Sequence, residues 1–181
     1  MEQYTKKQLE EKSKELAFLL RHDTNYQFDK HGWRTINDLI DNHGYTFDML
    51  DKIVSTDKKG RYEYNDDKTM IRACQGHSIS VNPDLKEAIP PDTLFHGTAT
   101  RFIEAINNEG IKKMSRNYVQ LSENIETAQD VGKRHGSSVV LMIDTKKMHE
   151  DGIKFYLSSN NVWMTEYIDP KYIIFFIKNV D

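Results

Sequence analysis

The chain has 181 residues, of which 38% are hydrophobic and 29% charged, and its formal net charge is -3. This balance suits a soluble globular protein of one domain or two small lobes, and the slightly acidic charge disfavours a broad basic face for long nucleic-acid tracts. The first residues lack the apolar core of a signal peptide, and no run reaches the roughly 18 apolar residues of a membrane span, so we expect a cytoplasmic protein.

Helices are predicted throughout the first part of the chain. Leucines at near-helical spacing indicate a helix from about residue 6 to 21. A short second helix follows the cap residue Thr35 and stops at Gly44, and a third begins after Thr46. Two extended runs then flank the polar turn 65–67 and predict a β-hairpin. Three helices followed by a hairpin is the order of a winged-helix module, a fold that often contacts nucleic acid.

Strands are predicted to dominate the second part. Turn-forming prolines between Pro83 and Pro91 mark a change in character, and we place a lobe boundary after residue 88. The segment 137–144 contains an unbroken apolar run, VVLMI, which predicts a buried strand. Gly110 is expected to end a helix in the left-handed conformation. The remaining strand-like runs lie at 93–98, 118–122, 153–159, 162–168 and 172–179, and the two helices at 101–110 and 124–136. We therefore predict an α+β chain with lobes at 1–88 and 89–181.

Several kinds of chemistry are disfavoured by the sequence. It has no glycine-rich dinucleotide fingerprint, P-loop, zinc-protease helix or nucleophile elbow. The seven histidines are scattered, so we expect no metal site. Cys74 is the only cysteine, which excludes an intramolecular disulfide and agrees with a reducing compartment. We interpret it as a small packing residue.

The first predicted helix ends on Arg21 and His22, two adjacent side chains suited to holding an anion. Helix electrostatics alone is a simpler explanation, because cations in a last turn are favoured by about 0.3–1 kcal/mol. Other polar residues in strand-like or cap-like contexts are Arg61, Arg72, His96, and those at 115–122 and 132–136. Each of them singly is typical of a surface or a satisfied core residue, but their number calls for one explanation.

Segments across nearly the whole chain resemble the RNA 2'-phosphotransferases, NAD-dependent enzymes that remove the internal 2'-phosphate left by one type of tRNA splicing. The matching segments, in the family's order, are LLRH, GW, KKGRY, IRACQGHS, LFHGT, RNYVQLS, VGKRHGSSVVL, GIKFY and NVWMT. The set formed by IRAxQGHS, HGT and GxRHG is highly specific. The resemblance implies an N-terminal winged-helix lobe that binds the RNA phosphate and a C-terminal lobe of ADP-ribosyltransferase type that binds NAD.

The resemblance also implies the roles of individual residues. The family's catalytic Arg-His-Arg-Arg group falls on Arg21, His22, Arg61 and Arg116. The residues implied to line the NAD site are His96, Gly97, Thr98, Gln120, Ser122, Arg134, His135 and Gly136. Arg72, Gln75 and His77 belong to the strongest motif and are expected mainly to build the lobe junction.

The chain departs from the family's pattern at a few positions. Gln120 stands where the family often has histidine, and an amide can bond a ribose hydroxyl but accepts no proton at neutral pH. Asn161 replaces a frequent glycine. We expect both changes to affect NAD affinity rather than the reaction type. Lys58 and Tyr62 also differ from the family's usual residues and are expected to be harmless.

The residue types suit this reaction. A 2'-phosphate dianion is already a nucleophile, so its attack on the nicotinamide ribose needs no base, only arginines that place it. When the RNA 2'-oxygen later departs, a histidine can protonate it. We expect as partners NAD and a tRNA-like RNA with an internal 2'-phosphate, no membrane, and a monomeric chain.

Two other interpretations of the sequence stay open. One is an ADP-ribosyltransferase that modifies nucleic acid or protein and stops at the adduct. The other is a winged-helix nucleic-acid-binding regulator whose second lobe senses a nucleotide.

Overall fold

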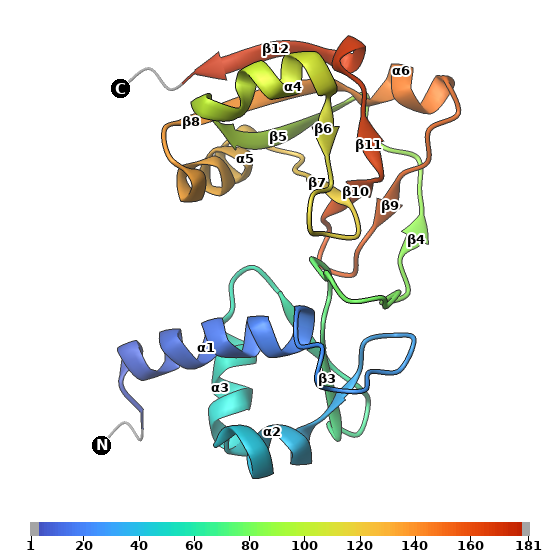
Figure 1. Ribbon diagram of the computed structural model, residues 1–181. Helices are drawn as coiled ribbons and strands as arrows, with labels where there is room; N and C mark the ends of the chain where they lie inside the picture. The colour runs from blue at the N-terminus through green and yellow to red at the C-terminus, as the bar shows by residue number, and fades with distance from the viewer. Residues whose placement is uncertain (1–3, 179–181) are drawn as a thin grey trace. The chain divides into compact units, whose positions relative to one another are not determined.

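The structure, a computed structural model, describes residues 4–178 and shows helices together with antiparallel strands (Figure 1). The predicted α+β class is confirmed. The chain divides into two compact units, Met1–Asp84 and Leu85–Asp181. The short strand β4 (Lys86–Glu87) lies in the second unit, where it pairs with β9 (Tyr156–Leu157). The boundary that we placed after residue 88 would leave this strand in the first unit.

The helices of the first unit begin and end where their capping residues predict. They are α1 (Lys6–Arg21), α2 (Ile36–His43) and α3 (Phe47–Thr56). The Thr35 hydroxyl accepts the Asp38 N–H at 3.3 Å, and the Thr46 hydroxyl accepts the Met49 N–H at 3.1 Å. Gly44 ends α2 in the left-handed conformation, with φ at 66°.

A small antiparallel sheet completes the first unit. Its strands, in the order β1-β3-β2, are β1 (Arg34–Thr35), β3 (Met70–Ala73) and β2 (Tyr62–Tyr64). The pairing of β2 with β3 confirms the predicted hairpin. Strand β1 was not predicted, because two residues are too few to show an alternation of polar and apolar side chains.

Two buried tyrosines hold α1 against the rest of the first unit. The Tyr45 hydroxyl donates to Lys12 O and the Tyr62 hydroxyl donates to Ser13 O, each at 2.8 Å. Burial raises the pKa of Tyr45, so the phenol stays a donor. The apolar stripe of α1 is fully buried at Leu16 and Leu20 in the same core. The end of α1 is thus fixed in position by packing and by hydrogen bonds.

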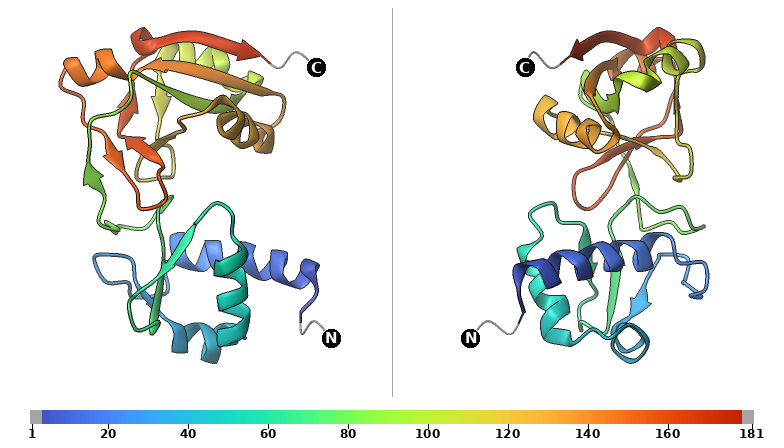
Figure 2. Two further views of the ribbon diagram at one scale, coloured as in Figure 1. Left: turned by 180° about the vertical axis from the view of Figure 1, so that it is seen from behind. Right: turned by 60° about the vertical axis from the view of Figure 1, so that its left-hand side comes forward.

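The second unit is built on short antiparallel strands in three sheets (Figure 2). The orders are β12-β8-β5, β4-β9-β10-β7 and β11-β6. The bounds not yet given are β5 (Thr93–Ala99), β6 (Ile111–Lys112), β7 (Val119–Leu121), β8 (Ser138–Asp144), β10 (Trp163–Thr165), β11 (Tyr167–Ile168) and β12 (Ile173–Lys178). The helices are α4 (Ile103–Glu109), α5 (Ile125–Gly132) and α6 (Thr145–Glu150).

Strand β8 is the central strand of its sheet and confirms the predicted buried strand. Leu141 and Ile143 point into the main core of the unit, opposite His96 and Leu94 of β5. Val140 points to the other face, where it lies opposite Gly97 and under α5. Helices α4 and α5 lie on opposite faces of this sheet (Figures 1 and 2). Both faces of β8 are covered, which explains why its sequence shows no alternation.

Some predicted elements differ from the structure. Gly110 does end α4 with a positive φ of 75°, but its ψ of -173° is not left-handed helical, because the chain continues extended into β6. The run 162–168 divides into β10 and β11, which join different sheets. Strands β6 and β11 and helix α6 were not predicted as separate elements. Asn179, the last residue of the final predicted strand, lies outside the described residues.

Candidate functional site

The predicted catalytic pair sits at the end of α1 in the first unit. Arg21 is the last helical residue, and His22 is the C-cap, whose N–H donates to Phe18 O at 2.8 Å. The segment after β3 is bonded to this helix end, because the Ser78 N–H donates to Arg21 O at 3.0 Å. The Ser78 hydroxyl lies 2.8 Å from Nδ1 of His22. The IRACQGHS motif therefore supports the LLRH motif directly.

Arg34 holds the same end of α1 through hydrogen bonds of its side chain. Its side chain is only 2% exposed, and it donates to Leu19 O at 3.0 Å and to the Asp23 carboxylate at 2.8 Å. Its Nε donates to Asp38 at 2.6 Å, and Nη2 lies 2.8 Å from His43 Nε2. Leu20, Arg21 and His22 lie between these two anchor points and are thus held between fixed neighbours. Sequence reasoning missed this role, and its only signal was the helical spacing of Arg34 and Asp38.

Arg61 lies on the loop that follows α3. Its guanidinium and its backbone N–H both donate to Asp57, at 2.5 and 2.6 Å. Its carbonyl accepts the Cys74 N–H at 2.9 Å, so the loop is tied to the end of β3. Burial raises the pKa of Tyr62, while the positive charges of Arg21 and Arg61 both oppose that rise. Arg21 and Arg61 therefore lie within electrostatic reach of the same phenol, and the gathering of His22 with Arg61 stays a prediction.

Arg116, the fourth residue of the predicted catalytic group, belongs to the second unit. It lies on the loop between β6 and β7, where its N–H donates to Lys113 O at 3.0 Å. Burial of this side chain lowers its pKa, as expected for a guanidinium in poorly solvated surroundings. The meeting of Arg116 with the three residues of the first unit stays a prediction.

The predicted NAD residues of the second unit gather around β5. Nδ1 of His96 lies 3.0 Å from the carbonyl of Gln120 on β7, so Nδ1 carries the hydrogen. Burial lowers the pKa of His96, a nearby His135 lowers it further, and the bond to Gln120 opposes both. Ser122 exchanges two backbone hydrogen bonds with Phe95, each at 2.8 Å. His96 is therefore a neutral imidazole joined to the strand that carries Gln120.

Two glycines explain how α5 reaches this cluster. A Cβ on Gly97 would lie 1.6 Å from the carbonyl oxygen of Ala128 in α5. A Cβ on Gly132 would lie 2.3 Å from Ser138 Oγ and 2.6 Å from Thr98 O. Only glycine allows the helix backbone to touch the strand backbone at these two points. The HGT and VGKRHG motifs are thus two sides of one contact.

The end of α5 carries the last group of predicted NAD residues. Arg134 and His135 lie in a 3₁₀ helix, Lys133–His135, and are exposed. Gly136 follows with φ at 127°, and the next residue ties this segment to β5 because Ser137 O accepts the Thr100 N–H at 2.9 Å. The second unit therefore brings these residues near the end of β5.

Arg72 has a structural role within the first unit. It donates to Glu63 at 2.7 Å and to Asp84 at 2.8 Å, and its guanidinium lies 4.3 Å from the Trp33 ring centre. His77 is buried, and its Nε2 would lie 3.5 Å from a Cβ on Gly32. Arg72 and His77 thus both make contacts within the first unit. The expectation that these two residues and Gln75 build the lobe junction stays a prediction.

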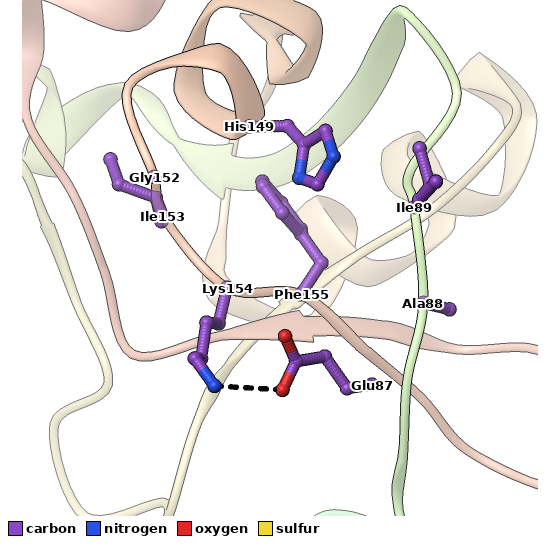
Figure 3. A pocket seen from close by; sticks show the side chains of 8 residues that line it. All are labelled: Glu87, Ala88, Ile89, His149, Gly152, Ile153, Lys154 and Phe155. Carbon is purple, nitrogen blue, oxygen red and sulfur yellow. Dashed lines mark hydrogen bonds and ion pairs between the residues drawn. The ribbon is translucent and has the colours of Figure 1, made fainter.

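A pocket of about 420 Å³ lies elsewhere in the second unit (Figure 3). Its walls include the Lys154–Glu87 ion pair at 2.9 Å, with His149 and Phe155 across from the segment after β4 that carries Ile89. None of the predicted site residues lines it. Within residues 4–178, no group of three or more histidine, cysteine or acidic side chains could hold a metal ion, and no helix is long and apolar enough to cross a membrane.

The fold and the polar residues favour one class of protein. Two arginines near one phenol in the first unit, and a half-buried histidine beside a glycine contact in the second, suit an enzyme that handles a phosphorylated substrate. A family model described as RNA 2'-phosphotransferase, Tpt1/KptA family, matches residues 7–167. The chain belongs to the RNA 2'-phosphotransferase family.

Individual relatives agree with this membership. Two proteins named "Probable RNA 2'-phosphotransferase", from Fusobacterium nucleatum and Flavobacterium johnsoniae, are each 47% identical to this chain. The matches cover 88% and 90% of this chain and 94% of each relative. A protein of the same name from Pseudomonas savastanoi is 42% identical over 89% of this chain. Membership in a transferase family disfavours the interpretation as a winged-helix regulator.

Proposed function

We propose that this protein removes an internal 2'-phosphate from RNA with NAD as co-substrate, as a monomer in the cytoplasm. The observation that carries the proposal is the family match, which extends through residues 7–167 and so includes both compact units. The first unit serves as a winged-helix module that holds the RNA phosphate, and the second as an ADP-ribosyltransferase-like module that binds NAD. A tRNA-like molecule is the substrate.

The donor set of the second unit suits NAD. Gln120, Ser122 and His135 offer amide, hydroxyl and imidazole groups of the kind that bond ribose hydroxyls and phosphates. The cluster also holds a neutral His96 whose Nδ1 is already engaged by a backbone carbonyl, so its ring orientation is fixed. NAD supplies an electrophilic ribose carbon and, beside it, a ribose hydroxyl. Thr98, Arg134 and the backbone at Gly97 and Gly136 complete the site.

The first step joins the 2'-phosphate to the nicotinamide ribose and releases nicotinamide. The role of Arg21, Arg61 and Arg116 is to hold the phosphate oxygens in line, since guanidinium groups can bond two oxygens at once. Asp57 keeps the Arg61 side chain in one orientation before the phosphate binds. No side chain has to remove a proton from a phosphate dianion, which agrees with the absence of a carboxylate among the predicted catalytic residues.

The second step transfers the phosphate fully to the ADP-ribose and frees the RNA 2'-hydroxyl. The products are ADP-ribose 1'',2''-cyclic phosphate and RNA without its 2'-phosphate. The arginines stabilise the charge that develops on the phosphate oxygens, and His22 protonates the departing RNA oxygen. General acid catalysis of this kind is worth about a hundredfold to ten-thousandfold.

The proposal is tested with NAD and a short oligonucleotide that carries one internal 2'-phosphate. Mass spectrometry should show the cyclic phosphate and the 2'-hydroxyl RNA in equal amounts. A stable ADP-ribosylated RNA from the wild-type protein would instead identify a transferase that stops at the adduct. In the His22→Ala variant this adduct should accumulate, while loss of nicotinamide release would contradict the role given to His22.

A further inference from the structure

The contact between Ser78 and His22 has no part in the mechanism as proposed so far. Ser78 follows β3 in the sequence, yet its Oγ lies 2.8 Å from Nδ1 of His22 at the end of α1. Ser78 itself is exposed, so this hydrogen bond is not a consequence of core packing. The serine lies in contact with the one predicted catalytic residue that has to move a proton.

The surroundings of Ser78 offer its hydroxyl hydrogen a second acceptor besides His22. Its Oγ also lies 3.5 Å from Arg21 O, a carbonyl that can only accept a hydrogen bond. When the hydroxyl hydrogen points to that carbonyl, a lone pair of the oxygen faces Nδ1. His22 then donates through an Nδ1–H, which places the second, transferable proton of the ring on Nε2.

A second contact limits the rotation of the same ring. The ring centre of Phe18, one helical turn earlier, lies 6.0 Å from that of His22 with the ring planes at 53°. Residues four apart on a helix face lie side by side, so Phe18 contacts the imidazole from the helix side. The imidazole is thus located by a hydrogen bond at Nδ1 and by an aromatic neighbour.

We propose that Ser78 is a positioning residue that holds His22 in the Nδ1–H form, so that Nε2 delivers the proton to the RNA 2'-oxygen. This inference rests on the proposed function. In the second step the ribose hydroxyl forms a new bond to phosphorus and gives its proton to water, while the bond from phosphorus to the RNA 2'-oxygen breaks. That oxygen takes the Nε2 proton, and His22 is left neutral with Nδ1–H on Ser78. Water later restores the Nε2 proton.

The Ser78→Ala variant isolates this role, because the backbone bond from residue 78 to Arg21 O does not need the side chain. We expect the second step to slow by about tenfold to a hundredfold, the usual effect of removing a group that orients a functional histidine. Nicotinamide release in the first step should change little, so the ADP-ribosylated RNA accumulates. Ser78→Thr, which keeps the hydroxyl, should restore most of the rate. Ser80→Ala, at an exposed serine nearby, is the matched control.

A spectroscopic measurement tests the inference without any turnover. Nitrogen-15 NMR of the imidazole groups distinguishes the two neutral forms, and the His22 signal is identified by its absence in a His22→Gln variant. We expect the Nδ1–H form in the wild-type protein and in Ser78→Thr, and a mixture in Ser78→Ala.

Two outcomes separate this inference from the function on which it rests. An active wild-type protein with His22 in the Nε2–H form, or an unchanged ratio of the two step rates in Ser78→Ala, would overturn the role of Ser78 alone. A wild-type protein that shows the Nδ1–H form but removes no phosphate would overturn the proposed function, and with it any catalytic role for this contact.

Discussion

Replacement of Arg34 by alanine should destabilise the first unit strongly, because it leaves two carboxylates without their partner. The Asp23 and Asp38 side chains are only 10% and 20% exposed, and both bond this guanidinium. Removing one partner of a buried ion pair costs about 3–5 kcal/mol. The alanine also leaves Leu19 O without a side-chain donor. We therefore expect the free energy of unfolding to fall by about 3–5 kcal/mol at pH 7.

The pH dependence of that loss follows from the two carboxylates. Burial raises the pKa of Asp23 and of Asp38, but hydrogen bonds to each, from Arg34 among others, outweigh burial and leave both values below the ordinary 3.8. A carboxyl with a lowered folded pKa stabilises the protein above its unfolded pKa and loses that contribution as the pH falls through the folded value. The difference between wild type and Arg34→Ala should therefore shrink as the pH falls below 3.8, through the lowered folded values.

The assay is urea unfolding followed by tryptophan fluorescence. Trp33 lies in the first unit and Trp163 in the second, so a Trp163→Phe background reports on the first unit alone. Lys7→Ala is the control, since its ion pair with Glu11 spans 4.0 Å on the surface and should change stability by less than about 1 kcal/mol. A loss in Arg34→Ala that is below about 1 kcal/mol, or equal at pH 3 and pH 7, would refute the reasoning.

Three further predictions concern the second unit. Gly97→Ala should prevent stable folding of the second unit, because the added Cβ would lie 1.6 Å from the carbonyl oxygen of Ala128. Thermal unfolding followed by circular dichroism measures this loss. The control is Gly44→Asn in the first unit, which should melt near the wild-type temperature because an added Cβ there has no atom within 4 Å. His96 has a pKa below 6.5, so its neutral form stabilises the fold above that pH, and this contribution is lost as the pH falls through the lowered value. Unfolding monitored by Trp163 should therefore show a lower stability at pH 5 than at pH 7.5. A His96→Gln variant with the same pH profile would count against this account. Asn161 has φ at 60°, so Asn161→Val should cost about 1–2 kcal/mol in urea unfolding and Asn161→Gly almost nothing; equal losses in both variants would show that backbone strain is not the cause.

Local sequence signals predicted most of the helices of the first unit and the buried strand of the second. Thr35, Gly44 and Thr46 carry their information in a few adjacent residues, because capping depends on neighbours in the chain. The apolar run within 137–144 indicates a strand that is covered on both faces, and β8 is such a strand. The same reasoning could not divide 162–168 into β10 and β11, because which sheet a residue joins depends on distant partners.

The site was predicted from motifs, and its supporting contacts were not. Arg21, His22 and Arg61 were predicted as a group; Arg21 and Arg61 lie within electrostatic reach of the Tyr62 phenol, and the common catalytic role of the three residues stays a prediction. Asp57, which bonds Arg61, lies just before the matching segment KKGRY, and Ser78, which bonds His22, carried no signal beyond its place in IRACQGHS. A hydrogen bond such as that of Ser78 to His22 joins segments far apart in the chain, so it depends on tertiary structure. The asparagine at 161 shows the converse case, since its positive φ explains why a relative would use glycine there.

The contact of α5 with β5 also restricts how this protein can vary. One inserted residue rotates the following part of a helix by about 100°. An insertion between Ala128 and Gly132 would turn one of the two small residues away from the strand and bring a larger side chain over Gly97 or Thr98. Insertions and deletions in this region should therefore be tolerated only before Asn124 or after Gly136. The number of residues from the start of α5 to the GKRHG segment should vary less among related proteins than the identity of most residues within it.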